Sequence, residues 1–251
     1  MSAAACITYL GHSSLLIEVN GLRLLTDPVF RDRITILRRT SPAVDVENYR
    51  DIDIVLISHL HFDHLDFNSL RQVEGTYRLV APRGAGSLLE KNGFRDYQEV
   101  QDGDEIGFGA LSLRAVFADH HRRRHPLGVA ADCLGFIIHG GVKIYYPGDT
   151  RLFPAMADLA GDLDVALLPV WGWGPDRGRL HMGPKEAVES LNLLQPRIAV
   201  PIHWGTYIPF WLSWAKPGFH YYPPLEFAAR AKKDAPQVKV RILLPGESLQ
   251  V

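Results

Sequence analysis

The hydrophobic positions of the chain fall into short runs that are typical of buried β-strands and are separated by turn residues. The runs Ser14–Val19 and Leu22–Thr26 flank an Asn-Gly pair at 20–21, which the two-residue turn of a β-hairpin favours. Residues 52–57 are apolar except for Asp53, a pattern typical of a strand buried on both faces. This part of the chain therefore predicts a hairpin followed by a central strand of a layered sheet.

Further strands and helices alternate along the rest of the chain. Gly93 and Pro184 mark two helix boundaries, because glycine ends helices in a left-handed conformation and proline is favoured at the first helical position. Strands in runs, with helices interleaved in both halves, predict two sheets covered by helices. Predicted strands span 77–80, 98–100, 105–108, 111–117, 134–139, 142–146, 165–169, 198–201 and 238–244; predicted helices span 86–92, 184–194 and 225–232, with a further short helix capped by Asn68 or Ser69.

The chain has the length and continuity of one domain. Its 251 residues are enough to bury a substantial core. The sequence shows no linker, low-complexity tract or internal repeat that would divide it. We therefore expect a single α/β domain over residues 1–251.

Composition argues against several classes of protein. The formal net charge is −1, so overall charge does not favour a nucleic-acid binder. The N-terminus lacks the pattern of a signal peptide, and no apolar run approaches the roughly 20 residues needed to cross a bilayer. Two cysteines, Cys6 and Cys133, are too few for a disulfide framework. We expect a cytoplasmic protein that does not insert stably into membranes and has no nucleic-acid partner.

The densest group of metal-binding side chains comes directly after the predicted strand at 52–57. His59, His61, Asp63 and His64 fall within six residues, and imidazole and carboxylate are the ligands that borderline divalent metals such as zinc prefer. His59 and His61 are too close in sequence to share one face of a helix, which indicates a loop. A set of surface histidines is the alternative, and the density of the group argues against it.

Three further sites follow predicted strand ends, where the functional loops of α/β proteins gather. His120 and His121 follow the strand that ends at 117, Asp149 follows the strand that ends at 146, and His203 follows the strand that ends at 201. One loop cannot fill the coordination shells of two ions, so these side chains are the candidates for the remaining ligands.

The complete pattern resembles the metallo-β-lactamase superfamily over most of the chain. Shorter motifs are similar to the branch that contains N-acyl-phosphatidylethanolamine-hydrolysing phospholipase D and the ascorbate-6-phosphate lactonases. The superfamily pattern is His59-x-His61-x-Asp63-His64 with Asp27, His120, Asp149 and His203; the branch motifs are Gly11-His12-Ser13-Ser14, Leu25-Thr26-Asp27-Pro28, Gly148-Asp149-Thr150 and Ile202-His203-Trp204-Gly205-Thr206.

The resemblance implies a four-layer αββα sandwich with mixed sheets and two divalent metal ions at one edge. His120 is preferred to His121 because the family histidine directly precedes an aromatic residue, although His121 itself stands where that residue is usually Trp. Asp27 is expected to orient a ligand histidine from behind. The implied ligands are His59, His61 and His120 for one ion, Asp63, His64 and His203 for the other, and Asp149 as the bridge.

Two metals roughly 3.5–4 Å apart can hold a hydroxide as the nucleophile and polarise the oxygen under attack. Asp63 is then a catalytic residue that positions the hydroxide. In the resembling branch, a histidine at the place of His181 faces the substrate, where it can act as general acid; a loop histidine without a catalytic role is the alternative. Zinc suits these ligands, and manganese and iron accept them as well.

The expected reaction is hydrolysis of a phosphodiester, lactone or related ester, and a small soluble, anionic or ester substrate is favoured. The sequence lacks the extended N-terminal region of the lipid enzyme of the branch, which argues against action on N-acyl phospholipids. The alternative from another class is a non-catalytic metal-binding interaction protein. The late tryptophans either contact substrate or pack loops onto the body: Trp171, Trp173, Trp204, Trp211 and Trp214.

Overall fold

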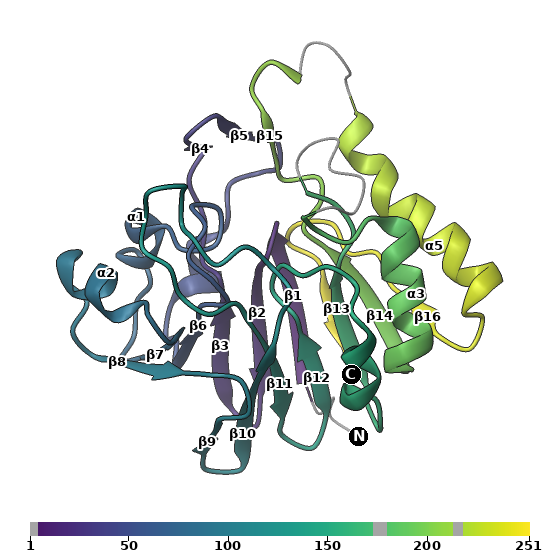
Figure 1. Ribbon diagram of the computed structural model, residues 1–251, viewed down its shortest axis with the longest axis horizontal. Helices are drawn as coiled ribbons and strands as arrows, with labels where there is room; N and C mark the ends of the chain where they lie inside the picture. Colours follow the sequence, from purple (N-terminus) through teal and green to yellow (C-terminus); the bar gives the residue numbers. More distant parts are fainter. Residues whose placement is uncertain (1–4, 173–179, 213–217) are drawn as a thin grey trace.

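Two mixed β-sheets lie face to face in the centre of the computed structural model, which describes residues 5–172, 180–212 and 218–251 (Figure 1). The first sheet has the strand order β17-β1-β2-β3-β6-β7-β8, and the second has the order β16-β14-β13-β12-β11-β10-β9. Helices α1 and α2 lie beside the first sheet, and α3 and α5 lie beside the second. The predicted α/β sandwich with mixed sheets is confirmed.

The elements have the following bounds. The first sheet contains β1 (Ala5–Gly11), β2 (Ser14–Val19), β3 (Leu22–Thr26), β6 (Ile54–Leu56), β7 (Arg78–Pro82), β8 (Tyr97–Val100) and β17 (Ser248–Gln250). The second contains β9 (Glu105–Phe108), β10 (Leu111–Phe117), β11 (Leu134–His139), β12 (Lys143–Tyr146), β13 (Val165–Pro169), β14 (Ile198–Ile202) and β16 (Lys239–Val240). The helices are η1 (Val46–Tyr49), α1 (Phe67–Leu70), α2 (Gly86–Lys91), η2 (Pro154–Leu159), α3 (Pro184–Leu194), η3 (Phe219–Tyr221) and α5 (Tyr222–Asp234).

Alternation along the strands sends neighbouring side chains into different layers of the core. Leu24 of β3 packs between the two sheets in one cluster with Phe136 of β11, whereas its neighbour Leu25 packs on the other face with Leu70 of α1. Full burial of each such side chain stabilises the fold by about 1.5–3 kcal/mol. The near-continuous apolar runs of the sequence therefore mark strands that are covered on both faces.

The predicted hairpin is confirmed, with Val19 paired to Leu22 across the turn. Asn20 and Gly21 have φ values of 53° and 76°, the left-handed conformation that the turn requires and that these residue types tolerate. The sequence pattern at this point was sufficient because a two-residue turn depends only on local backbone chemistry.

Three predicted boundaries are wrong. Helix α1 begins at Phe67, ahead of both expected caps, because Asp66 caps it and its carboxylate accepts the backbone N–H of Ser69 at 2.9 Å. Helix α5 begins at Tyr222 rather than at 225. Its first turn contains two prolines, which are tolerated there because the first backbone N–H groups of a helix have no partner within the helix. The last strand is not 238–244: β16 pairs only with Ile198 and Ala199.

A small third sheet and strand β1 were not predicted. The sheet contains β4 (Arg33–Ile34), β5 (Leu37–Arg39) and β15 (Tyr207–Pro209) in the order β15-β5-β4. In this sheet Ile208 of β15 pairs with Arg38 of β5, although the two strands are far apart in the sequence. The sheet lies at the edge of the sandwich above β3 and β14 (Figure 1). None of the described helices is long and apolar enough to cross a membrane.

Candidate metal centre

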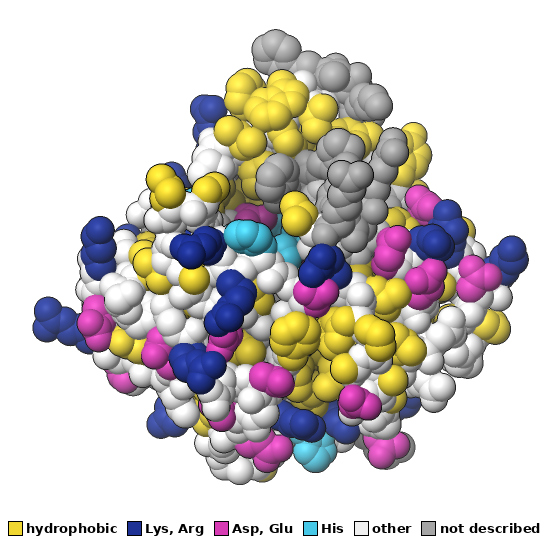
Figure 2. Space-filling model, in the orientation of Figure 1, with side chains coloured by type: hydrophobic (Ala, Val, Ile, Leu, Met, Phe, Trp, Pro, Cys, Tyr) yellow, Lys and Arg dark blue, Asp and Glu magenta, His cyan; other side chains and the backbone are white. Residues whose placement is uncertain are grey.

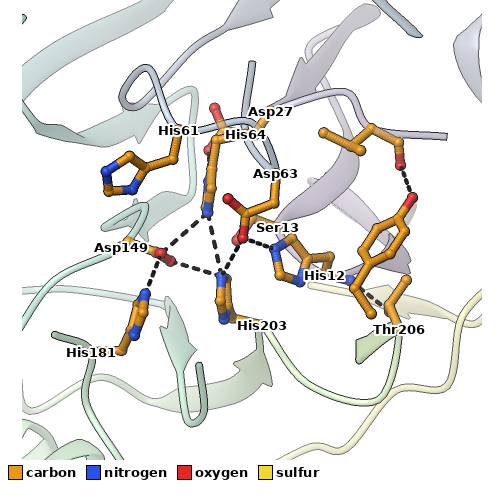
Figure 3. Close-up of polar contacts among 12 residues, drawn as sticks. His12, Ser13, Asp27, His61, Asp63, His64, Asp149, His181, His203 and Thr206 are labelled. Carbon is orange, nitrogen blue, oxygen red and sulfur yellow. Dashed lines mark hydrogen bonds and ion pairs between the residues drawn. The ribbon is translucent and has the colours of Figure 1, made fainter. Parts of the chain in front are cut away.

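The predicted ligands lie together at the edge where five strands end, as expected for the carboxyl ends of strands in α/β proteins. Figure 3 shows side chains from distant parts of the chain converging on Asp149. The strand ends supply Asp27 after β3, His59, His61, Asp63 and His64 after β6, His120 after β10, Asp149 after β12 and His203 after β14.

One group of donors consists of His59, His61 and His120. Nδ1 of His61 lies 3.0 Å from Nε2 of His59 and 3.0 Å from Nε2 of His120. Their facing nitrogen atoms all lie within 4.8 Å of one another. Three imidazole nitrogens directed at one point form a typical zinc-type donor set.

A second group consists of His12, Asp63, His64 and His203, all buried. Nε2 of His64 lies 3.3 Å from Nε2 of His203, and Oδ2 of Asp63 lies 3.9 Å from the same nitrogen of His203. The group therefore contains the three predicted ligands of the second ion, together with His12 of the motif Gly11-His12-Ser13-Ser14, which was not among the predicted ligands.

Asp149 lies between the two groups. Its Oδ2 is 3.2 Å from Nε2 of His64 and 3.8 Å from Nε2 of His120, and its Oδ1 is 3.2 Å from Nε2 of His203. Oδ1 is buried and makes no hydrogen bond. A buried carboxylate oxygen without a hydrogen-bond partner is costly unless it binds a cation.

The outward nitrogen atoms of the histidines fix which nitrogen faces the centre. Nδ1 of His120 lies 2.9 Å from the carbonyl oxygen of Leu180, and Nδ1 of His203 lies 2.5 Å from that of Trp171. Nε2 of His61 lies 3.0 Å from the carbonyl oxygen of Arg123. A carbonyl only accepts, so each outward nitrogen carries the proton and each inward nitrogen presents a lone pair, as a metal ligand must.

Asp27 holds His64 in the same way. Its Oδ2 is 2.6 Å from Nδ1 of His64 and accepts the Tyr146 hydroxyl at 2.6 Å, and its Oδ1 accepts the backbone N–H of Ser58 at 2.7 Å. Oδ2 also accepts the Ser58 hydroxyl, whose oxygen lies 2.9 Å from Nδ1 of His59. The expected orienting role of Asp27 is therefore matched by direct contact with a histidine of the site.

The histidines of the site differ in their electrostatics. Burial alone would lower the pKa of His64, but Asp149 and Asp27 outweigh it and raise that pKa well above its usual value. Burial lowers the pKa of His59 well below its usual value and the pKa of His120 to about 3. Burial alone would raise the pKa of Asp149, but His203 and His64 outweigh it and hold the pKa of that carboxyl well below its ordinary value. Neutral imidazoles and ionised carboxylates are the forms that bind divalent ions.

His12 contacts Asp63 directly, with 3.0 Å between Nε2 and Oδ2, and its ring lies 3.9 Å from that of His203. The backbone of His12, Asp27 and His203 has positive φ values of 59°, 35° and 61°. Such conformations are strained for residues other than glycine and cluster at functional sites. The sequence signal for His12 was its position in the turn after Gly11, which a local pattern alone does not distinguish from an ordinary turn.

Neighbouring histidines differ in position. Nε2 of His120 points towards His61, whereas the ring of His121 stacks outside His61 at 6.3 Å, so the structure brings His120 into the group and leaves His121 at its edge. His181 is buried, and its Nε2 lies 2.9 Å from Oδ2 of Asp149. His181 therefore reaches the same carboxylate as the predicted ligands.

A cavity of about 510 Å³ opens beside the donor groups and is bordered by His61, Asp63, His120 and His181.

The late tryptophans that the structure describes differ in their exposure to solvent. Trp204 is buried and stacks on Tyr9, Trp171 is half-buried, and Trp211 is exposed. Trp173 and Trp214 lie outside the described residues. Packing therefore accounts for Trp204.

Arg124 binds both ends of the loop that carries the histidines, a role the sequence did not suggest. Its Nη1 donates to the carbonyl oxygen of Leu60 at 2.5 Å and its Nη2 to that of Leu65 at 3.0 Å. The guanidinium lies 4.2 Å from the ring centroid of Phe62. Burial lowers the pKa of Arg124 to about 10, so the side chain remains a cation at neutral pH.

Comparison with known proteins gives related sequences over the whole chain. Residues 22–204 match the family described as beta-lactamase superfamily domain. A UPF0173 metal-dependent hydrolase of Aeropyrum pernix is 30% identical over 264 residues, covering 98% of this chain and 97% of that protein. N-acyl-phosphatidylethanolamine-hydrolyzing phospholipase D 1 of Caenorhabditis elegans is 27% identical over 234 residues, covering 80% of this chain and 64% of that protein.

Solved structures are similar as well. Igni18, a metallo hydrolase of the hyperthermophilic archaeon Ignicoccus hospitalis, superposes with a TM-score of 0.72 at 25% identity. The match covers 98% of this chain and 97% of that one. The similarity therefore includes both sheets and the edge that carries the donor groups.

Proposed function

The chain belongs to the beta-lactamase superfamily and is a metal-dependent hydrolase, and we propose on this basis that it hydrolyses a phosphodiester, a lactone or a related ester of a small molecule. The observation that carries the proposal is the position of Asp149 between two groups of metal-type donors. Its buried Oδ1, without a hydrogen bond, fits a cation at this point.

The donors divide between two ions in our proposal. His59, His61 and His120 would hold the first with three nitrogen atoms, and Asp63, His64 and His203 would hold the second with an oxygen and two nitrogen atoms; Asp149 would be within reach of both. Zinc is the preferred ion for such a set, and manganese and iron accept the same donors. Two divalent ions in such a site supply an activated water at neutral pH and polarise the phosphoryl or carbonyl oxygen under attack.

In our proposal Asp63 orients the attacking water. Its side chain borders the cavity, and its Oδ2 is fixed by the contact with His12 at 3.0 Å. Burial would raise the pKa of Asp63, but the contact with His12 and the charge of His64 hold the pKa well below its usual value. An ionised carboxylate at the cavity wall can accept a hydrogen bond from water and hold that water towards the substrate.

In our proposal His181 protonates the leaving group. It borders the cavity, and its Nε2 lies 2.9 Å from Oδ2 of Asp149. This contact with a carboxylate favours a protonated Nε2. A proton held there can pass to the leaving oxygen as the ester bond breaks, the role of a general acid.

Metal analysis combined with activity measurements tests the proposal. We expect the purified protein to bind two equivalents of zinc or manganese and to hydrolyse bis-p-nitrophenyl phosphate or members of a lactone panel. Asp149→Ala should lose at least one equivalent and reduce kcat/KM by more than 10³-fold. An active Asp149→Ala protein with both metals bound contradicts the two-ion site; a wild-type protein with two metals and no turnover indicates a metal-binding interaction protein.

A further inference from the structure

Exposed apolar side chains gather around the cavity beside the donor groups. Ile36, Phe62 and Leu180 are 42%, 37% and 53% exposed and all line this one cavity. Exposed apolar surface is unfavourable in water and, when contiguous, marks a binding site. Figure 2 shows histidine side chains at the surface of this face, with hydrophobic side chains above them in the region of β4, β5 and β15.

The apolar wall of the cavity, formed by Ile36, Phe62 and Leu180, is held in place by the fold. Ile34 and Leu37 of the β4–β5 hairpin also line the cavity, and both are buried in a small cluster with Val29 and Tyr207. Their packing fixes the hairpin, so that Ile36 at its tip faces the cavity from a rigid support. Pockets that are largely preformed and mostly apolar are typical of sites for small molecules.

Phe62 and Leu180 are fixed as well. The guanidinium of Arg124 covers the Phe62 ring at 4.2 Å, and the carbonyl oxygen of Leu180 lies 2.9 Å from Nδ1 of His120. Both apolar residues are therefore tied directly to the loops that carry the proposed metal ligands. A group bound against them would lie next to the donor residues.

Apart from Pro126, polar side chains occupy the rest of the lining. The donor residues form one part, and His121, Arg123 and His125 add a basic side. Asp63 is the only acidic side chain among the described residues that line the cavity. The volume of about 510 Å³ lies within the range of roughly 300–1,000 Å³ of small-molecule pockets.

We propose that the substrate is amphiphilic: its ester group lies at the donor residues, and a hydrocarbon chain of several carbons lies against Ile36, Phe62 and Leu180. This inference rests on the proposed function, because it assigns the ester to the same site. It differs from the sequence-based expectation of a small soluble substrate, since a wholly polar substrate would leave the apolar wall in water.

Two homologous series of substrates test the proposed hydrocarbon chain directly. The first contains γ-lactones with side chains from methyl to octyl, and the second contains alkyl p-nitrophenyl phosphodiesters from methyl to octyl. With metal-loaded protein below the micellar concentration of each compound, kcat/KM should rise about twofold to fourfold per added methylene in the series that is hydrolysed. A flat or falling dependence in that series overturns the inference and leaves the hydrolase proposal intact.

Binding measurements separate the two proposals. Calorimetric titration with n-alkylphosphonates from ethyl to octyl should show affinity that rises with chain length and a negative change in heat capacity. Chain-dependent binding without turnover of either series supports the apolar site and contradicts the proposed hydrolysis. Affinity that is independent of chain length overturns the apolar site.

Variants of the lining residues test whether the hydrocarbon chain binds in this cavity. Ile36→Ser and Leu180→Ser should lower the ratio of octyl to ethyl alkylphosphonate affinity by at least threefold each. Leu244→Ser removes an apolar side chain of similar exposure, 50%, outside this cavity, and should leave the ratio unchanged. If the wild type and both cavity variants share one affinity ratio, the hydrocarbon chain binds elsewhere, and its assignment to this cavity is wrong.

Discussion

Nδ1 of His64 lies 2.6 Å from Oδ2 of Asp27, and both side chains are completely buried. The same carboxylate accepts hydrogen bonds from Ser58 and Tyr146. These contacts leave the His64 ring one orientation, with Nε2 directed at Asp149. The position of a proposed ligand is thus set by a residue that approaches it from behind.

Asp27→Asn should weaken the second metal while retaining the first. The amide keeps the shape of the side chain but presents two N–H groups where the carboxylate accepts several donors. We expect the affinity for the second equivalent to fall by roughly 10–100-fold, measured by competition with a zinc indicator. Asp53→Asn is the control, since Asp53 accepts the backbone N–H of Arg23 away from the site. Unchanged affinity for both equivalents contradicts the orienting role.

His181→Asn should reduce kcat by roughly 10²–10⁴-fold for substrates with a poor leaving group. The loss should be much smaller with p-nitrophenolate, which leaves without a proton. Metal content should not change. His139→Asn, at an exposed position in β11, is the matched control. Equal losses for both leaving groups, or a loss of metal, would show that His181 acts as a ligand or a structural residue.

Arg124→Lys should loosen the loop that carries the histidines. A single ammonium group cannot reach the carbonyl oxygens of Leu60 and Leu65 together, and the stacking on Phe62 is lost. We expect the free energy of unfolding to fall by about 1–3 kcal/mol, with faster amide exchange in residues 60–65. Arg230→Lys, at an exposed pair with Glu226 on α5, provides the comparison. Unchanged exchange in the loop would argue against the positioning role.

Chelation should destabilise the protein reversibly. Without a cation, the buried Asp149 carboxylate keeps an oxygen without a hydrogen bond, and several imidazole lone pairs face one another. Zinc at 100 times its dissociation constant should stabilise the folded state by about 2.7 kcal/mol per site. Thermal melts with a chelator, and again after added zinc, measure this shift. A melting temperature that does not respond to either treatment contradicts a metal site in the folded protein.

The ligand-type residues were readable from the sequence because they follow strand ends within a few positions. The apolar run before His59 marks a strand, and His59 and His61 are too close in sequence to share one face of a helix. Strand ends in an α/β sandwich share one edge, so Asp149 and His203 were expected near them, and the structure places them there. The Asn-Gly hairpin was predictable for the same local reason.

Only the tertiary structure placed His12, Arg124 and the cavity wall. His12 lies in the turn between β1 and β2, and it reaches Asp63 because this turn and the loop after β6 lie at the same edge of the first sheet. Strand β1 was itself not predicted. Arg124 meets the histidine loop from a segment about sixty residues away. The β4–β5 hairpin is held by pairing with β15, which the sequence pattern of either segment does not reveal. The sequence by itself determined the donor types, since these depend on residue chemistry and local spacing. Their second contacts and the shape of the cavity depend on which distant surfaces pack together, and long-range packing decides that.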